Sequence, residues 1–220
     1  LQDTNTWAVT QFTGSELIEL GGDERKFRFA KGPSFADPRL VDGIAFISCE
    51  FADSLIAFDT KQAKVVRSYA TGKRPYPADI TQDRKRAFVP NRADSTVTVI
   101  DLELGTTIAT VRIGFQPEGG ALTTDDRWYL AACGGSDEIY FIDTASYEVA
   151  EIVSDDIGPR PFSVAVTQDG QFGIVNNAGG SSLSIIDLEK REVVQTIEVG
   201  KQPIAVRMHP DGKRYFVANE

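Results

Sequence analysis

The sequence predicts an all-β fold built from repeated four-stranded units, and three recurring features predict it. A Gly-x-x-Pro step recurs, an Asp follows each Pro by eight residues, and a second Asp closes an apolar run eighteen residues later. Successive prolines lie 42, 44 and 42 residues apart. Such constant spacing marks an internal repeat. The landmarks are Gly72–Pro75, Gly114–Pro117, Gly158–Pro161 and Gly200–Pro203, then Asp83, Asp125, Asp169 and Asp211, then Asp101, Asp143 and Asp187, with an earlier counterpart at Asp59.

Each repeat is expected to hold four short strands. In the copy that begins at Pro161, these are residues 162–167, 171–177, 182–187 and 194–199. Alternation of apolar and polar residues, with turn residues every 8–12 positions, is typical of antiparallel strands. No apolar stripe of helical period is found, so we expect essentially no helix.

The repeat favours a radial arrangement of these units. A four-stranded sheet of this length cannot bury both of its faces alone, whereas sheets placed face to face around an axis bury them and leave only short edges. A β-sandwich is the competing all-β solution, but a sandwich does not need equal spacing in successive repeats. The sequence therefore predicts a single β-propeller domain over residues 1–220.

The last repeat carries a family resemblance. Residues 197–206 (IEVGKQPIAV) and 209–219 (HPDGKRYFVAN) resemble the consensus of YVTN-repeat propellers, which are WD40-like. The likeness extends from about residue 44 to the end. It implies a seven-bladed ring and a periplasmic, secreted or cell-surface location. Some propellers of this kind are scaffolds or binding modules, and others are related to propeller lactonases or to enzyme subunits that carry quinone or haem.

The number of blades is open to two interpretations. Repeats begin near 33, 75, 117, 161 and 203, the last is incomplete, and residues 1–30 form a degenerate partial blade with strands at 7–11, 16–20 and 26–29. The C-terminal strand pair could complete a blade with residues 16–29 and close a five-bladed ring. Otherwise the chain is part of a longer, seven-bladed propeller, which the surplus strand at 7–11 favours.

Composition argues against several classes of partner. The net charge is −9 and the isoelectric point is near 4.7, whereas nucleic-acid binding needs a concentrated basic face. No apolar run approaches the length of a membrane span. The chain contains no signal peptide and opens at Leu1 rather than Met, so we expect a mature form, a trimmed chain or a fragment.

Residues that recur in every repeat are expected to be structural. The repeated aspartates can accept backbone N–H bonds in turns, and no Asp-x-Asp-x-Asp loop accompanies them. Cys49 and Cys133 occupy equivalent positions two blades apart, too far for a disulfide, so both are expected to be reduced and buried. His209 is the only histidine, which disfavours a His-based metal cage or triad. We predict no metal site, no cofactor and no catalytic residue.

Positions that vary between repeats are the candidates for function. They lie in and after each Gly-x-x-Pro step, which leads to the inner strand of a blade and so to one rim of the central channel. The candidate binding residues are Arg74, Tyr76, Asp79, Glu118, Arg160, Phe162, Lys201 and Arg207. We expect a partly basic funnel, charged by Arg74, Arg160 and Lys201, for a small anionic ligand or an acidic loop. The alternative is that these are solvated loop residues.

These residues favour a non-catalytic binding or scaffold propeller, monomeric if its ring is complete, with a protein or small-molecule partner. A propeller-lactonase-like hydrolase is the first alternative, and its acid and base would come from Glu118, Asp79 and Arg207 on three blades. A propeller subunit of a redox enzyme complex is the second alternative.

Overall fold

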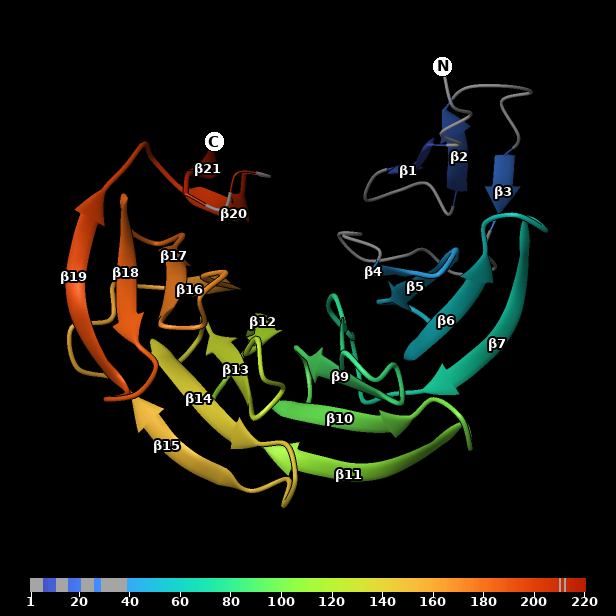
Figure 1. Ribbon diagram of the computed structural model, residues 1–220, viewed down its shortest axis with the longest axis horizontal. Coiled ribbons are helices and arrows are strands. Elements are labelled where there is room, and N and C mark those ends of the chain that lie inside the picture. Colours follow the sequence, from blue (N-terminus) through green and yellow to red (C-terminus); the bar gives the residue numbers. More distant parts are fainter. Residues whose placement is uncertain (1–5, 11–15, 21–25, 29–38, 210, 212) are drawn as a thin grey trace.

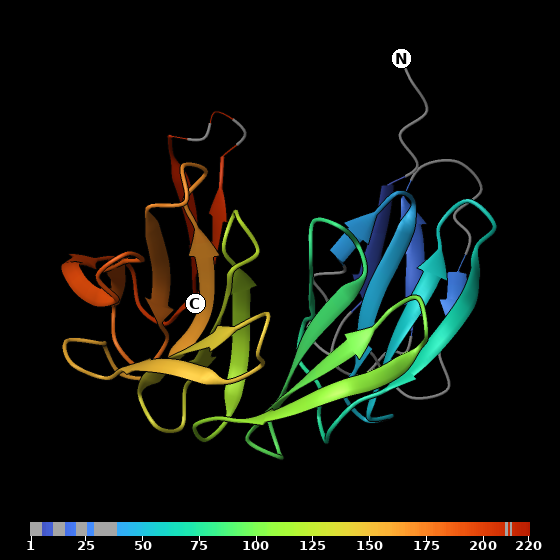
Figure 2. The same ribbon diagram turned by 60° about the horizontal axis from the view of Figure 1, so that its bottom comes forward.

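The computed structural model describes residues 6–10, 16–20, 26–28, 39–209, 211 and 213–220. The described residues form six antiparallel sheets, here called blades 1 to 6, which follow one another along an arc (Figure 1). Turning the arc shows the sheets standing on edge as separate twisted blades (Figure 2). No helix occurs in this part of the chain. The fold is a β-propeller, as the repeat predicts.

The strands keep the same order in every complete blade, so that each strand pairs with its neighbours in sequence. Blade 1 contains β1 (Thr6–Thr10), β2 (Glu16–Leu20) and β3 (Lys26–Arg28); blade 2 contains β4 (Arg39–Val41), β5 (Ile44–Cys49), β6 (Ser54–Asp59) and β7 (Lys64–Ala70); blade 3 contains β8 (Asp79–Ile80), β9 (Arg86–Asn91), β10 (Thr96–Asp101) and β11 (Thr106–Arg112). Blade 4 contains β12 (Pro117–Leu122), β13 (Trp128–Cys133), β14 (Glu138–Asp143) and β15 (Val149–Val153); blade 5 contains β16 (Pro161–Val166), β17 (Phe172–Asn177), β18 (Ser182–Asp187) and β19 (Glu192–Glu198); blade 6 contains β20 (Pro203–Met208) and β21 (Tyr215–Asn219).

The blade that would be shared between the two ends of the chain is not formed. β21 pairs with β20, while β2 pairs with β1 on one side and β3 on the other. Because β1 already occupies the edge of β2, that edge cannot accept the C-terminal pair. The two ends of the chain therefore share no blade in this structure, and the number of blades, five or seven, stays a prediction. The start of the repeat near residue 33 lies outside the described residues.

Among the described residues, four of the five hydrophobic clusters lie between blades, and the fifth lies within blade 2. One cluster joins Leu130 and Phe141 of blade 4 to Val175 and Ile186 of blade 5, and all four side chains are essentially inaccessible to solvent. Similar clusters join blades 2 and 3, blades 3 and 4, and blades 5 and 6. Each sheet thus covers the apolar face of its neighbour, which is why strands of alternating pattern are stable in this arrangement.

The local geometry repeats with the sequence. A break in register between the third and fourth strands occurs at Ala57/Phe58, Val99/Ile100, Phe141/Ile142 and Ile185/Ile186. A bulge of this kind increases strand twist, and its recurrence gives each blade the same shape.

The repeated aspartates are structural, as predicted. Thr123 donates its hydroxyl hydrogen to Asp125 Oδ1 at 2.6 Å, and the backbone N–H of Arg127 donates to the same oxygen at 3.0 Å. The equivalent Thr–Asp bonds occur at Asp83 and Asp169. Asp59, Asp143 and Asp187 each accept backbone N–H bonds in the turn that follows the third strand.

The cysteines also match expectation, since Cys49 and Cys133 are both free and buried. Burial raises the pKa of Cys49 to about 11 and raises that of Cys133 further, so neither thiol is ionised at neutral pH. His209 follows β20, where its Nδ1 lies 3.1 Å from Asp211 Oδ1. Among the described residues, no three His, Cys, Asp or Glu side chains gather in a way that would hold a metal ion. No helix in the same residues is long and apolar enough to cross a membrane.

Candidate functional site

A cavity of about 1050 Å³ lies inside the arc, along the inner strands of blades 3 to 6. Its wall is formed by β8, β12, β16 and β20 and by the loops that lead into them. Seven of the eight candidate residues line it, and they come from four blades; they are Arg74, Tyr76, Asp79, Glu118, Arg160, Phe162 and Arg207. Lys201 is not among the lining residues, although its neighbour Gln202 is.

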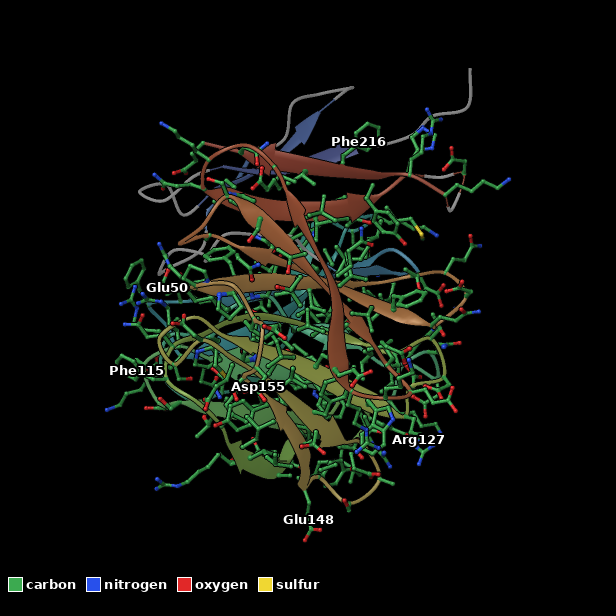
Figure 3. The ribbon with its side chains drawn as sticks, turned by 90° about the vertical axis from the view of Figure 1, so that its left-hand side faces the viewer. Glu50, Phe115, Arg127, Glu148, Asp155 and Phe216 are labelled. Atoms are coloured by element: carbon green, nitrogen blue, oxygen red, sulfur yellow. The ribbon has the colours of Figure 1, made fainter. Side chains whose placement is uncertain are left out.

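The lining of this cavity extends from the loops that precede the inner strands, with Arg74 and Arg160, to Gln82 and Asp126 at the other end of those strands. The end at Arg74 and Arg160 lies at one rim of the arc and is here called the mouth. Figure 3 shows Glu50 and Phe115 at that rim and Arg127 at the opposite rim. Five charged residues lie at the mouth and are here called the mouth cluster: Glu50, Arg74, Arg92, Glu118 and Arg160.

Glu118 is the centre of the mouth cluster. Its side chain is only 1% exposed and belongs to blade 4. Arg92 of blade 3 donates from Nε to Glu118 Oε1 at 2.9 Å. Arg160 of blade 5 donates from Nε to Oε2 and from Nη2 to Oε1, both at 3.4 Å. One buried carboxylate therefore holds guanidinium groups from the blades on both sides of its own.

The third arginine has a partner of its own. Arg74 donates from Nε to Oε1 of the buried Glu50 at 2.8 Å, and its Nη2 contacts the same oxygen. The structure differs from the partly basic funnel expected from the sequence. Arg74 is paired with Glu50, Arg160 shares Glu118 with Arg92, and Lys201 does not line the cavity. The unbalanced positive charge of the mouth cluster is instead that of Arg92 and Arg160 together, since they share Glu118.

Backbone hydrogen bonds also fix the positions of Arg74 and Arg160. Arg74 and Arg160 have φ angles of 55° and 52°, in the left-handed region that non-glycine residues seldom adopt. The backbone N–H of Arg74 donates to Asp53 Oδ1 at 3.0 Å, and that of Arg160 donates to Asp137 Oδ1 at 2.7 Å. Each aspartate belongs to the preceding blade. Neighbouring blades therefore pin the backbone and the side chain of these arginines at once.

Gly134 makes room for the shared carboxylate. A Cβ atom at this position would lie 2.7 Å from Glu118 Oε2 and 3.0 Å from the carbonyl oxygen of Pro161. Real Cβ atoms essentially never show the first distance, and the second is tighter than nine in ten real Cβ contacts. Any larger residue would push Glu118 or Arg160 out of place, so the mouth cluster depends on this glycine.

Aromatic side chains border the mouth cluster. The rings of Tyr76 and Phe162 meet edge to face, with centroids 6.5 Å apart, although they belong to blades 3 and 5. The guanidinium of Arg160 lies 5.8 Å from the ring centre of Phe162, which is a cation–π geometry. Burial raises the pKa of Tyr76, and the charge of Glu50 raises it further, so its hydroxyl stays protonated at neutral pH.

The charge of Arg92 is secured by its partner. Burial by itself lowers the pKa of Arg92, but the hydrogen bond to Glu118 and the nearby negative charge outweigh this, and the pKa is raised. Only Nε of its guanidinium has an acceptor among the residues that the structure describes. The four N–H groups on its two Nη atoms therefore stay available, at the cavity wall, to an anion.

Deeper in the cavity, Asp79 is buried and accepts the backbone N–H of Leu122 on Oδ2 at 2.7 Å and that of Ile80 on Oδ1 at 3.1 Å. Arg207 lines the cavity from blade 6, and its Nη1 donates to the carbonyl oxygen of Val206 at 2.9 Å. Glu118, Asp79 and Arg207 thus face one cavity from three blades, as the hydrolase alternative requires. Both carboxylates already accept hydrogen bonds from the protein.

Sequence reasoning missed Glu50 and Arg92. Both follow the second strand of a blade, and the equivalent positions are Gly134, Ala178 and Glu220. This position varies as strongly as the Gly-x-x-Pro step. The same test of variation between repeats, applied to it, would have found both residues.

No protein-family model and no curated protein matches the chain. Solved structures do match. Hydrazine synthase of Kuenenia stuttgartiensis is 25% identical with a TM-score of 0.74, and the match covers 80% of this chain and 52% of that one. A functionally unknown protein of Desulfotomaculum acetoxidans DSM 771 is 17% identical with a TM-score of 0.85, covering 99% and 73%.

A third match is the dihydro-heme d1 dehydrogenase NirN in complex with DHE, at 18% identity and a TM-score of 0.65, covering 85% of this chain and 43% of that one. The chain therefore spans about half the length of the hydrazine synthase chain. These likenesses and the repeated four-stranded blades agree on the fold, whereas membership of the YVTN-repeat family stays a prediction. The chain is a β-propeller with a charged, aromatic-bordered cavity at the centre of its arc.

Proposed function

We propose that this chain is a non-catalytic binding propeller whose channel mouth holds the anionic group of a small ligand or of an acidic protein loop. The observation that carries the proposal is the arrangement around Glu118, where two arginines share one buried carboxylate at the wall of a large cavity. Guanidinium groups held in place by the protein lose little freedom on binding, which favours affinity for an anion. The predicted periplasmic or cell-surface location remains part of the proposal.

The test compares two basic residues of the same rim. The thermal midpoint of unfolding is measured across a panel of organic and inorganic anions for wild type, Arg92→Ala and Lys201→Ala. For wild type and Lys201→Ala, a binding anion should raise the thermal midpoint. The corresponding gain in the free energy of unfolding is about 2.7 kcal/mol when the anion is at 100 times its dissociation constant. Arg92→Ala should lose that shift. Equal shifts in all three proteins, or none in wild type, would contradict the proposal.

A second candidate function is that of a propeller subunit in a redox enzyme. It is favoured by two of the matched structures, a hydrazine synthase and a dihydro-heme d1 dehydrogenase, whose names describe redox enzymes. The visible absorption spectrum of the protein purified from its native source separates the two candidates. A cofactor band that copurifies with the chain would favour the redox subunit, and a colourless protein that binds anions would favour the binding module.

A further inference from the structure

The charges of the mouth cluster define how much negative charge it can accept. Arg74 is neutralised by Glu50, while Arg92 and Arg160 share the single charge of Glu118. Within the mouth cluster, one positive charge is therefore left over. A ligand group with one negative charge balances it, whereas a group with two charges would leave an excess of negative charge beside the buried Glu118, which is unfavourable at low dielectric.

The rest of the wall opposes a second anionic group. Beyond the mouth cluster, three carboxylates line the cavity, those of Asp79, Asp126 and Glu220, against the single guanidinium of Arg207. The buried Asp79 carboxylate already accepts two backbone N–H bonds, and Asp126 accepts the backbone N–H of Gln82 at 2.6 Å. A ligand with a second carboxylate would bring it towards these like charges.

The body of the ligand would meet an apolar surface. Below Phe162, the inner strand β16 presents Val164, Ala165 and Val166 to the cavity, and β20 presents Ile204 and Ala205. The cavity, at about 1050 Å³, is far larger than an inorganic anion needs and lies at the upper end of the range for small-molecule sites. The edge-to-face rings of Tyr76 and Phe162 offer an aromatic border next to the arginines.

We infer that the channel mouth binds a monocarboxylate with an apolar, ring-bearing body, oriented with its carboxylate on Arg92 and Arg160 and its body along β16 and β20. This inference rests on the proposed function and specifies its ligand. The planar guanidinium fork matches a carboxylate better than it matches a spherical anion. Glu118 is a positioning residue, because it sets the place and the net charge of the two arginines without touching the ligand.

The experiment is a calorimetric titration with four probes: acetate, phenylacetate, malonate and inorganic phosphate. Phenylacetate should bind wild type about tenfold or more tightly than each of the other three. The comparison with acetate tests the apolar body, and the comparisons with malonate and phosphate test the single charge. Arg92→Ala and Arg160→Gln should each weaken phenylacetate binding about tenfold or more, while Lys201→Ala should bind as wild type does.

The Glu118→Gln variant tests whether the net charge of the mouth cluster, rather than the loss of a single ligand contact, sets the preferred charge of the ligand. It leaves two arginines without their shared carboxylate, so the preference should move from phenylacetate towards malonate. Should this variant not fold, Arg160→Gln carries the test, since it removes the excess charge and keeps Glu118.

Tighter binding of malonate or phosphate by wild type, lost in Arg92→Ala, would overturn the inferred ligand class and leave the proposed function standing. Absence of binding by every anion would overturn both.

Discussion

The turns of the blades and the mouth of the cavity contain the same kinds of residue and use them differently. In the turns, Asp83, Asp125 and Asp169 each accept a bond from a threonine two residues earlier in the same blade. At the mouth, Glu118 has no counterpart in the other blades, and its partners come from the blades on either side. These three repeated carboxylates thus serve their own blades, whereas Glu118 joins three blades.

The comparison teaches which carboxylates to treat as functional. Eight repeated aspartates suggest metal chemistry when they are counted, but the bonds that Asp83, Asp125 and Asp169 accept from threonine lie within a local turn. Glu118 has no acidic counterpart at the equivalent position of the other repeats, and it is buried at the wall of the cavity that seven candidate residues line. Three changes, taken from the largest expected effect to the smallest, test this distinction.

Glu118→Gln should be the most destabilising of these changes, lowering the free energy of unfolding by about 2–3 kcal/mol, because it leaves Arg92 partly buried without a counter-charge. The matched control is Glu192→Gln, whose carboxylate is 60% exposed and lies 3.8 Å from Lys190. Glu192→Gln should lower the free energy of unfolding by less than about 0.5 kcal/mol. Chemical denaturation followed by circular dichroism measures both. Equal losses in the two variants would mean that Glu118 is no more structural than a surface residue.

Asp125→Asn should cost about 1 kcal/mol at neutral pH, since it weakens the bonds from Thr123 and Arg127. The hydroxyl of Thr123 lowers the pKa of Asp125, so the folded pKa lies below the unfolded one. The stability that the carboxylate contributes is therefore complete above about pH 4 and is lost as the pH falls through the folded pKa. Denaturation of both proteins at neutral and acid pH checks this, because their difference should shrink on acidification. A constant difference would contradict it.

Tyr129→Phe should raise the free energy of unfolding slightly, by up to about 1 kcal/mol, because it removes a buried polar group for which the described residues offer no hydrogen-bond partner. The Tyr129 hydroxyl is fully buried beside Gly120 and lacks a hydrogen bond among the described residues, while its ring stacks on Phe88 at 5.1 Å. Tyr140→Phe is the control, and it should lower the free energy of unfolding, because the Tyr140 hydroxyl donates to Glu138 Oε2 at 3.1 Å. A clear loss of stability in Tyr129→Phe would show that the hydroxyl has a partner, such as a bound water.

The fold could be predicted from the sequence because the spacing of Gly, Pro and Asp is a local property of each repeat. The same spacing predicted the four strands of each blade and the bonding of Asp125. The mouth cluster could be predicted only in part. The sequence marks Arg160 and Glu118 as variable positions, but their pairing depends on the angle between blades, which the spacing within one repeat does not determine.

Arg92 shows most clearly what the sequence alone does not predict about the mouth cluster. It follows a regular second strand and looks like an exposed turn residue in the sequence. Only the approach of blade 3 to blade 4 brings its Nε to Glu118. Lys201 shows the converse, since its charge and its place in the Gly-x-x-Pro step suggested a role in the funnel, yet it does not line the cavity.

The central claim is that residues which differ between repeats bind the ligand, whereas residues which recur hold the fold. It is tested most directly by the shift that phenylacetate produces in the thermal midpoint of wild type, Asp125→Asn and Arg92→Ala. The account predicts that Asp125→Asn melts lower than wild type but keeps the full shift, and that Arg92→Ala loses the shift whatever its own midpoint. A shift that disappears in Asp125→Asn, or persists in Arg92→Ala, would contradict it.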